Sequence, residues 1–237
     1  MRLVCVIPAR LAATRLPQKP LRLLRGEPLI RVVARRALSL DLGGPVVVAS
    51  DDERVLEAVA PLGVPGVLTA SHRSGTDRVA EVARRPEYAG ADVILNLQGD
   101  EPFLPREAAA GAVARVLGGD DVGTAAQPLS PDAWRDPRRV KVEVDGRGRA
   151  LRFFRTPGAP ACPHRPPTFH HVGVYAYRPD TLARWSALPP TAAEEAEGLE
   201  QLRPLARGFT IGVATLTDSV PHGIDTEDDL KTAEALL

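Results

Sequence analysis

Short apolar runs alternate with segments of helical periodicity through the first half of the chain. The apolar runs are predicted as strands at residues 3–7, 46–49, 64–69 and 93–97. Helices are predicted from near Pro28, after a cap at Ser50–Asp51, and at residues 76–84 and 105–117. Continuously apolar strands are typical of a sheet covered on both faces, and strands that alternate with helices predict parallel pairing with right-handed crossovers.

The pattern changes after about Asp121. Strands are predicted at residues 122–127, 140–144, 150–154, 171–177 and 209–216, and the second and third of these are expected to form a hairpin around Asp145–Gly146. Helices are predicted at residues 193–206, with a bend at Pro204, and after a cap at Thr226. We interpret residues 1–237 as one α/β domain, with roughly residues 130–178 as a hairpin insertion and dimer surface.

Composition argues against several classes of partner. The 237 residues include 30 basic and 30 acidic side chains, so there is no basic excess to bind nucleic acid or an anionic membrane. No apolar stretch approaches the roughly 20 residues of a membrane span, and the first residues lack the apolar region of a signal peptide. Cys5 and Cys162 are expected to be unpaired in a reducing cytosol. We therefore predict a cytoplasmic protein without a nucleic-acid or membrane partner.

Three cations lie in one short loop between the first predicted strand and the first helix. Arg10, Arg15 and Lys19 belong to the stretch IPARLAATRLPQKPL. A strand, a cationic loop and a helix place a ligand at the carboxyl edge of a parallel sheet, and these cations suit the oxygens of a phosphate chain. A solvated basic loop without a ligand fits the spacing equally well. The stretch contains no glycine, which excludes a Walker A loop and a GxGxxG fingerprint.

Two acidic residues are candidates for a metal site. Asp100 follows the predicted strand at residues 93–97 in the sequence NLQGDEP, and Asp225 precedes the last helix in the sequence GIDT. Mg²⁺ commonly binds one or two carboxylates together with substrate phosphates. Each acid also has a purely local interpretation, because Asp100 can cap its turn and Asp225 can cap the helix. Sequence spacing alone does not bring the two together.

Six motifs occur in the order typical of one enzyme family. They are IPARLAATRLPQKPL, SGTDRVAEV, NLQGDEP, HVGVYAYR, LEQLRPL and GIDTEDDL. Through them the chain resembles, over nearly its whole length, the 3-deoxy-manno-octulosonate (Kdo) cytidylyltransferases, or CMP-Kdo synthetases. The first and third motifs are partly shared with other sugar nucleotidyltransferases, whereas the last three point more narrowly to the Kdo enzymes. The resemblance implies a mostly parallel, Rossmann-like α/β sheet.

The resemblance also implies an activity, which is transfer of CMP from CTP to the anomeric hydroxyl of Kdo with release of pyrophosphate. The enzymes that it resembles use Mg²⁺, are cytoplasmic and usually dimeric, and act in lipopolysaccharide precursor synthesis. Such a transfer needs positioning and charge neutralisation more than covalent help.

The resemblance assigns roles to individual positions of this chain. The residues that it places at the triphosphate are Arg10, Arg15 and Lys19. Those near the nucleotide are Ser74, Arg78 and Gln98. The implied Mg²⁺ ligands are Asp100 and Asp225, which with Lys19 are also the implied catalytic residues. The positions at the Kdo sugar are Gln98, His171, Tyr175, Glu200 and Gln201.

Two positions depart from the family pattern. Gln18 stands where the family usually has glycine, and Ala13 stands where serine is common. The proline-rich loop at residues 156–167 matches poorly as well, and it leaves Arg155 and Arg165 as alternative partners for the sugar carboxylate.

Simpler interpretations exist for the sugar-side residues. His171 and Tyr175 share one strand face by their period-two spacing, so core packing would explain them without the resemblance. Glu200 and Gln201 would ordinarily form a solvated helix face. Two other functions also fit the chain: a transferase for another acidic sugar, such as sialic acid or an amino analogue of Kdo, and a non-catalytic nucleotide-binding module.

Overall fold

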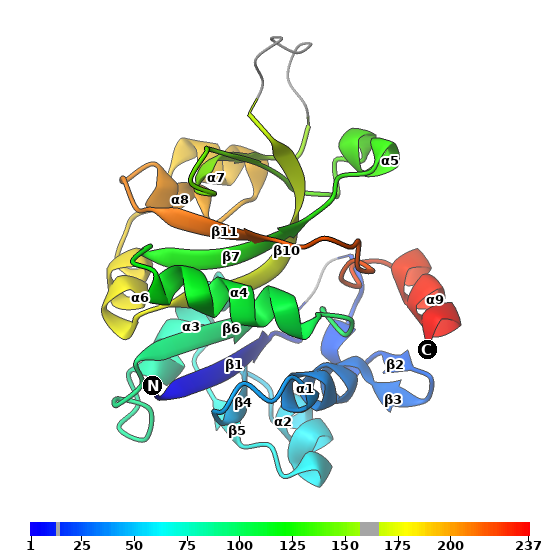
Figure 1. The fold of residues 1–237 in the computed structure, drawn as a ribbon. Coiled ribbons are helices and arrows are strands. Elements are labelled where there is room, and N and C mark those ends of the chain that lie inside the picture. The colour runs from blue at the N-terminus through cyan, green and yellow to red at the C-terminus, as the bar shows by residue number, and fades with distance from the viewer. Residues whose placement is uncertain (13–14, 157–165) are drawn as a thin grey trace. The chain divides into compact units, whose positions relative to one another are not determined.

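The computed structural model describes residues 1–12, 15–156 and 166–237 (Figure 1). The chain divides into two compact units, residues 1–106 with 220–237 and residues 107–219. Among the described residues, every helix is too short or too polar to span a bilayer. The predictions for Ala13, Cys162 and Arg165 concern positions outside the described residues.

The first unit is built on a parallel sheet. Its strands are β1 (Leu3–Ala9), β4 (Val46–Ser50), β5 (Gly66–Leu68) and β6 (Val93–Leu97), in the order β6-β1-β4-β5 (Figure 1). Every residue of β1, β4 and β6 is buried, as expected for strands covered on both faces. The prediction of a parallel α/β sheet is confirmed, although β5 is three residues shorter than the predicted strand.

Three helices connect these strands in the sequence: α1 (Leu29–Ser39), α2 (Glu53–Val59) and α3 (Gly75–Ala83). Helix α1 begins directly after Pro28, as predicted. Helix α2 is capped by Asp52 and not by Ser50–Asp51, because the Arg54 N–H donates to the Asp52 carboxylate at 3.0 Å. The short ladder of β2 (Leu23–Leu24) and β3 (Glu27–Pro28) was not predicted.

The last segment of the chain completes the first unit. Helix α9 (Glu227–Leu236) begins after the predicted cap Thr226, whose hydroxyl accepts a hydrogen bond from the Asp229 N–H. It lies beside β2 and β3 in Figure 1. An ion pair between Arg22 and Glu227 joins α9 to the residue before β2, with an N–O distance of 2.5 Å.

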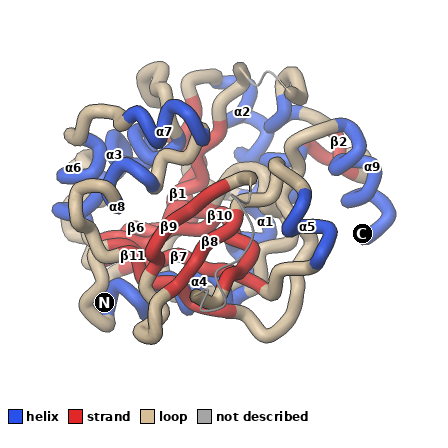
Figure 2. Tube along the Cα trace, turned by 90° about the horizontal axis from the view of Figure 1, so that it is seen from above, coloured by secondary structure: helices blue, strands red, loops and turns tan. Residues whose placement is uncertain are grey.

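The second unit contains a mixed sheet. Its strands are β7 (Val122–Gln127), β8 (Lys141–Val144), β9 (Ala150–Phe154), β10 (Thr168–Tyr177) and β11 (Ile211–Thr215). Strand β7 pairs in parallel with β11 and antiparallel with β10, while β8 pairs antiparallel with both β10 and β9. Figure 2 shows β8, β9 and β10 side by side. The predicted pairing of residues 140–144 with 150–154 is therefore confirmed, whereas the interpretation of this region as an insertion and a dimer surface stays a prediction.

The helices of the second unit differ more from prediction. They are α4 (Arg106–Leu117), α5 (Pro131–Arg135), α6 (Pro179–Ser186), α7 (Ala192–Glu197) and α8 (Leu202–Leu205). Helix α4 was predicted, but α5 and α6 were not. The single helix predicted at residues 193–206 is wrong, because Gly198 adopts φ 62° and ψ 41° and ends α7 before α8 begins. A left-handed glycine is a common helix terminator.

Aromatic side chains form part of the core of the second unit. Trp185 of α6 is 1% exposed and meets Tyr175 and Tyr177 of β10 edge to face, with centroids 6.0 and 5.7 Å apart. Trp134 meets Phe154 in the same way at 6.2 Å. Both tryptophans therefore contribute to packing. Edge-to-face contacts of this kind add stability beyond the area that they bury.

Candidate active site

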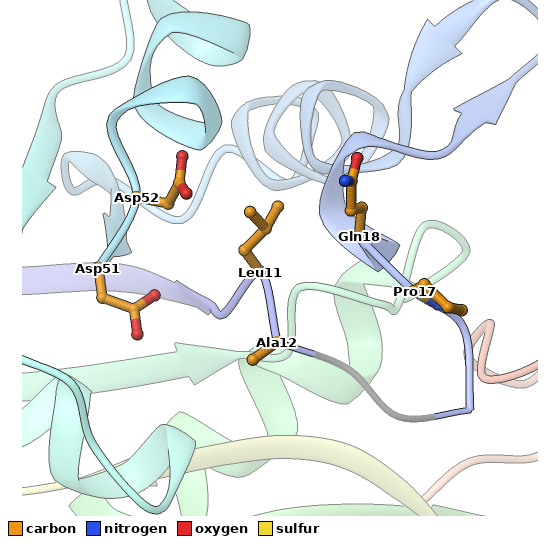
Figure 3. Close-up of a pocket in the computed structure, with 6 residues that line it drawn as sticks. All are labelled: Leu11, Ala12, Pro17, Gln18, Asp51 and Asp52. Atoms are coloured by element: carbon orange, nitrogen blue, oxygen red, sulfur yellow. The ribbon is translucent and has the colours of Figure 1, made fainter.

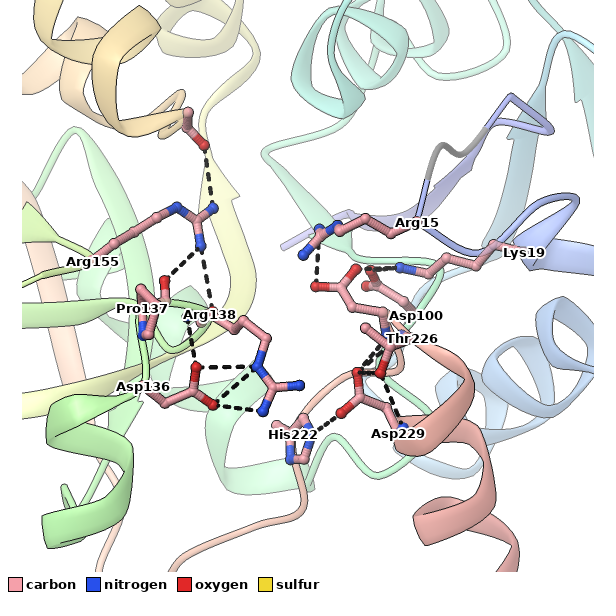
Figure 4. A network of polar contacts seen from close by, with 12 residues as sticks. Arg15, Lys19, Asp100, Asp136, Pro137, Arg138, Arg155, His222, Thr226 and Asp229 are labelled. Carbon is pink, nitrogen blue, oxygen red and sulfur yellow. Dashed lines mark hydrogen bonds and ion pairs between the residues drawn. The ribbon is translucent and has the colours of Figure 1, made fainter.

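One lysine in the loop after β1 joins two acids that are far apart in the sequence. The ammonium of Lys19 donates to Oδ1 of Asp225 at 2.8 Å and to Oδ2 of Asp100 (Figure 4). Nη2 of Arg15 lies 3.1 Å from Oδ2 of Asp225. Because one nitrogen contacts both carboxylates, their oxygens surround a common point. The structure thus brings together four of the residues to which the resemblance gives roles.

Charge and burial stabilise this cluster in its ionised form. The Lys19 side chain is only 15% exposed, and burial alone would lower its pKa. The negative charges of Asp100 and Asp225 outweigh that effect and raise the pKa of Lys19. Burial alone would raise the pKa of Asp225, but Lys19 and Arg15 hold that pKa below its usual value. At neutral pH the lysine is therefore a cation and Asp225 is an anion.

Two loops present the acids to Lys19. Asp100 follows β6 after Gly99, where a Cβ atom would lie only 2.8 Å from the carbonyl oxygen of Pro8. Glycine is therefore required for the close approach of this loop to β1. The segment before α9 is joined to the same loop, because the Ile224 N–H donates to the carbonyl of Asp100 at 2.9 Å. The two acids thus lie on backbone segments that are hydrogen-bonded to each other.

A further acid, Asp229, contacts the backbone at Asp225 and was not identified from the sequence. Oδ2 of Asp229 accepts hydrogen bonds from the backbone N–H groups of Asp225 and Thr226, at 3.1 and 2.9 Å, and Oδ1 faces His222 at 2.7 Å (Figure 4). Burial alone would raise the pKa of Asp229, but these hydrogen bonds lower it to about 2. The spacing of Thr226 and Asp229 is a capping-box pattern and could have revealed this residue.

The rest of the cationic loop lies beside an open pocket of about 450 Å³ (Figure 3). The residues around it are Leu11, Ala12, Pro17, Gln18, Asp51 and Asp52. Gln18 adopts the left-handed conformation, with φ 53° and ψ 32°, at the start of the 3₁₀ turn Lys19–Leu21. Arg10 is exposed. The loop therefore presents Arg10 to solvent and directs Arg15 and Lys19 to the acids.

Ser74 and Arg78 have structural partners in the first unit. The Ser74 hydroxyl caps α3 by accepting the Asp77 N–H at 3.1 Å. Arg78 is 2% exposed, forms an ion pair with Asp51 at 3.1 Å and donates to Thr69. It therefore joins the loops that follow β4 and β5. Gln98 is half-buried, and its amide donates to Asn96 at 3.2 Å.

Four of the five predicted sugar-side residues lie in the second unit, whereas Gln98 lies in the first. His171 contacts the Thr124 hydroxyl at 2.9 Å, and its ring lies 5.4 Å from that of Tyr175. The two side chains do lie next to each other, although a register shift in β10 separates them. Burial, with a contribution from His170, lowers the pKa of His171 to about 3, so the imidazole is neutral. Burial also raises the pKa of Tyr175.

The alternative interpretation of Glu200 and Gln201 as a solvated helix face is wrong. Gln201 is buried, Glu200 is half-buried, and both precede α8. Arg155 is also engaged: its Nε donates to the Glu197 carbonyl at 2.8 Å, and its other nitrogens contact the carbonyls of Pro137, Arg138 and Gly198 (Figure 4). These contacts use the guanidinium to join the end of α7 to the loop before β8.

Asp100 and Asp225 are the residues best placed to hold a metal. In the part of the chain that the structure describes, no group of three or more His, Cys, Asp or Glu side chains could do so. Two carboxylates that already surround one cation nevertheless fit Mg²⁺, which takes its other ligands from phosphates and water. The Lys19 ammonium stands where positive charge is favoured.

Comparison with known proteins identifies the family. Residues 4–212 match the family model for cytidylyltransferases. The chain is 51% identical to the 3-deoxy-manno-octulosonate cytidylyltransferase of Gemmatimonas aurantiaca, over 98% of this chain and 93% of that protein. The chain belongs to this family. The 3-deoxy-manno-octulosonate cytidylyltransferase of Rhodospirillum centenum is 47% identical, over 98% of this chain and 92% of that protein.

Solved structures agree with this family assignment. A structure of CMP:2-keto-3-deoxy-manno-octonic acid synthetase complexed with CTP has a TM-score of 0.89 and 38% identity, covering 100% of this chain and 98% of that one. A cytidylyltransferase from Leptospira borgpetersenii has a TM-score of 0.65 at 16% identity, covering 99% of this chain and 86% of that one, and shows a shared fold alone.

The backbone at position 18 offers a physical reason for the glycine of the family pattern. Position 18 of this cytidylyltransferase has a left-handed backbone, which glycine adopts at no steric cost and other residues adopt at a cost of about 1 kcal/mol or more. Gln18 keeps that backbone conformation. The departure from the pattern therefore places a glutamine side chain beside the pocket, on a backbone conformation that favours glycine.

Proposed function

We propose that this cytidylyltransferase transfers CMP from CTP to the anomeric hydroxyl of Kdo, with Mg²⁺ held by Asp100 and Asp225. Family membership carries the transfer itself. The observation that supports the metal site is the convergence of both carboxylates on the Lys19 ammonium. A cation, whether an ammonium or a divalent metal, is favoured between two carboxylates.

The cationic loop is proposed to bind the triphosphate. Arg15 and Lys19 approach the acids, and Arg10 is exposed to solvent on the same loop. Guanidinium groups suit bidentate phosphate contacts, and ammonium suits a point contact. When phosphate oxygens are bound, Lys19 and Arg15 would stabilise the charge that develops on departing pyrophosphate. Bound Mg²⁺ would supply further neutralisation and polarise the α-phosphate.

The reaction does not require a covalent intermediate on the protein. The sugar hydroxyl attacks the α-phosphorus while pyrophosphate leaves on the opposite side, so orientation and charge stabilisation account for most of the catalysis. The first unit offers cations and carboxylates for that purpose within one hydrogen-bonded cluster. We propose Lys19, Asp100 and Asp225 as the catalytic residues.

The sugar-side assignments are proposed on the resemblance. His171 is neutral, so it would offer Kdo a hydrogen bond and not a charge. Tyr175, Glu200, Gln201 and Gln98 are proposed to contact Kdo as well. Arg155 is the poorer candidate for the sugar carboxylate, because its guanidinium already contacts backbone carbonyls. We therefore favour Arg165, which lies outside the described residues.

The test of substrate is release of pyrophosphate with Mg²⁺ and CTP, with and without Kdo. Parallel reactions replace CTP by UTP, GTP or ATP, and Kdo by sialic acid or an amino analogue of Kdo. Release with CTP and Kdo alone is expected. A higher kcat/KM for another acidic sugar would show that this other sugar is the preferred substrate. Binding of CTP without release in any reaction would support a nucleotide-binding module.

The test of the metal site is a pair of matched variants. Asp225→Asn should lower Mg²⁺-dependent activity by about a hundredfold, because one carboxylate ligand is lost. Asp228→Asn is the control, since Asp228 is an acid of the same helix end with an 89% exposed side chain. Equal Mg²⁺-dependent activity in the two variants would show that Asp225 is not a ligand. We also propose that the protein is a cytoplasmic homodimer. Sedimentation of the purified protein tests whether it is a dimer.

A further inference from the structure

Two residues near the start of α9 have no role in the proposed reaction: His222, in the segment before the helix, and Asp229, in its first turn. We propose that they are positioning residues for Asp225, which hold its backbone so that its carboxylate meets the divalent cation. This inference rests on the proposed function, in which Asp225 is a metal ligand. Neither residue contacts substrate in the proposal, and both act through Asp225.

The first support is the number of hydrogen bonds that Asp229 accepts at one oxygen. Its Oδ2 receives the N–H of Asp225 at 3.1 Å, the N–H of Thr226 at 2.9 Å and the Thr226 hydroxyl at 2.8 Å. The residue is buried, at 8% exposure, so these bonds are shielded from competing water. The peptide group between Ile224 and Asp225 is thereby held in one orientation.

The second support is a partner that keeps the Asp229 carboxylate from turning. Nε2 of His222 lies 2.7 Å from Oδ1, the oxygen that faces away from the turn (Figure 4). A carboxylate engaged at both oxygens has one preferred rotamer. The chain of contacts therefore runs from His222 through Asp229 to the backbone of Asp225, within one short segment.

The acid of the other capping box, at the start of α7, accepts fewer backbone N–H groups than Asp229 does. In α7 the Glu194 carboxylate accepts the backbone N–H of its own cap residue Thr191 at 3.3 Å, and Arg203 donates to both of its oxygens. The preceding residue there is Pro190, which has no N–H to donate. In α9 the acid also holds Asp225, the residue one position before the cap. The additional bond falls on the proposed metal ligand.

The same segment is connected to the other proposed ligand. The Ile224 N–H donates to the Asp100 carbonyl at 2.9 Å. A Cβ atom at Gly223 would lie 3.1 Å from that carbonyl oxygen, so the two segments are in close contact. A shift of the backbone at Asp225 would therefore disturb Asp100 as well. Partners of this kind that orient metal ligands typically change metal affinity 10- to 100-fold when they are removed.

The test measures metal affinity without turnover. Mn²⁺ replaces Mg²⁺ as a paramagnetic probe, and its dissociation constant is measured by electron paramagnetic resonance for the complete protein with CTP and without Kdo. His222→Ala and Asp229→Ala should each weaken Mn²⁺ binding about tenfold. His222→Gln, which keeps a donor near the position of Nε2, should restore affinity to within about twofold. Asp228→Ala removes a neighbouring charge of α9 and should bind as the unmodified protein does.

The outcomes separate a positioning role from a structural one. If His222→Ala and Asp229→Ala lower only the thermal midpoint, while Mn²⁺ affinity at 20 °C is unchanged, the proposal is overturned. If Asp229→Ala does not fold, His222→Ala decides alone, because it leaves the capping box intact. Loss of affinity in His222→Ala that His222→Gln does not recover would also count against the proposal.

A parallel variant distinguishes failure of this inference from failure of the proposed function. Asp225→Ala should lose Mn²⁺ binding more severely than either positioning variant. If Asp225→Ala binds Mn²⁺ normally, the metal assignment itself is wrong. If Asp225→Ala loses binding while His222→Ala and Asp229→Ala retain it, the metal assignment stands and the positioning role is wrong.

Discussion

The ammonium of Lys19 lies 2.8 Å from Oδ1 of Asp225 and donates to Asp100 in the same cluster. One ammonium therefore contacts both of the acids that are proposed to hold Mg²⁺. Binding of a metal to these acids would release Lys19 from at least one of them. In the proposed function the released ammonium would bind the triphosphate, so this single side chain would link metal binding to nucleotide binding.

Replacement of Lys19 by methionine tests that link. Lys19→Met keeps the length of the side chain and removes its charge, so kcat/KM for pyrophosphate release should fall by about a hundredfold or more. The two carboxylates would then repel each other, and added Mg²⁺ should raise the thermal midpoint more than in the unmodified protein. Lys231→Met is the control, because the Lys231 side chain is 75% exposed. Unchanged kcat/KM in Lys19→Met would refute the catalytic role.

The left-handed backbone at Gln18 predicts an order of stabilities. Gln18→Gly should leave the free energy of unfolding unchanged or raise it by up to about 1 kcal/mol, because steric strain is relieved while the unfolded chain gains entropy. Gln18→Val should lower it by about 1–2 kcal/mol, because β-branched residues rarely adopt a positive φ. Urea unfolding of both variants provides the measurement, with Gln18→Ala as the intermediate control. A valine variant as stable as the glycine variant would show that the backbone at position 18 is not strained.

Burial of neutral His171 predicts acid sensitivity. Its pKa is about 3 in the folded protein and about 6.5 when unfolded, so the unfolded chain binds the extra proton between these pH values. This residue should therefore lower the free energy of unfolding by up to about 1.4 kcal/mol for each pH unit below 6.5. His171→Asn should show a shallower loss of stability from pH 6.5 to 4.5 by urea unfolding. A slope equal to that of the unmodified protein would exclude His171 as the cause.

Arg155 and Arg165 are expected to behave differently when each is replaced by alanine. Arg155→Ala removes the donors to Glu197 and to the loop at Pro137, so the free energy of unfolding should fall by about 1–3 kcal/mol. Arg165→Ala should instead raise KM for Kdo. Thermal unfolding and steady-state kinetics on both variants separate the two effects. A raised KM for Kdo in Arg155→Ala, without loss of stability, would reverse the assignment.

Local patterns predicted most of the parallel sheet. The apolar runs at residues 3–7 and 93–97 became β1 and β6, because a short buried strand is encoded by its own side chains. The prediction of one helix at residues 193–206 was wrong because the break in this segment depends on tertiary packing. Its composition is helical, but the left-handed Gly198 and the burial of Gln201 depend on how the segment packs.

The candidate site shows the same division. The sequence alone indicated which residues are candidates for the chemistry, because the motifs around Lys19, Asp100 and Asp225 place cations and carboxylates in loops that follow strands or precede a helix. Only the tertiary structure decided that these charges meet, and that Asp229 and His222 hold the last of them. A contact between residues distant in the chain depends on the path of the whole backbone, and local side-chain preferences do not contain that path.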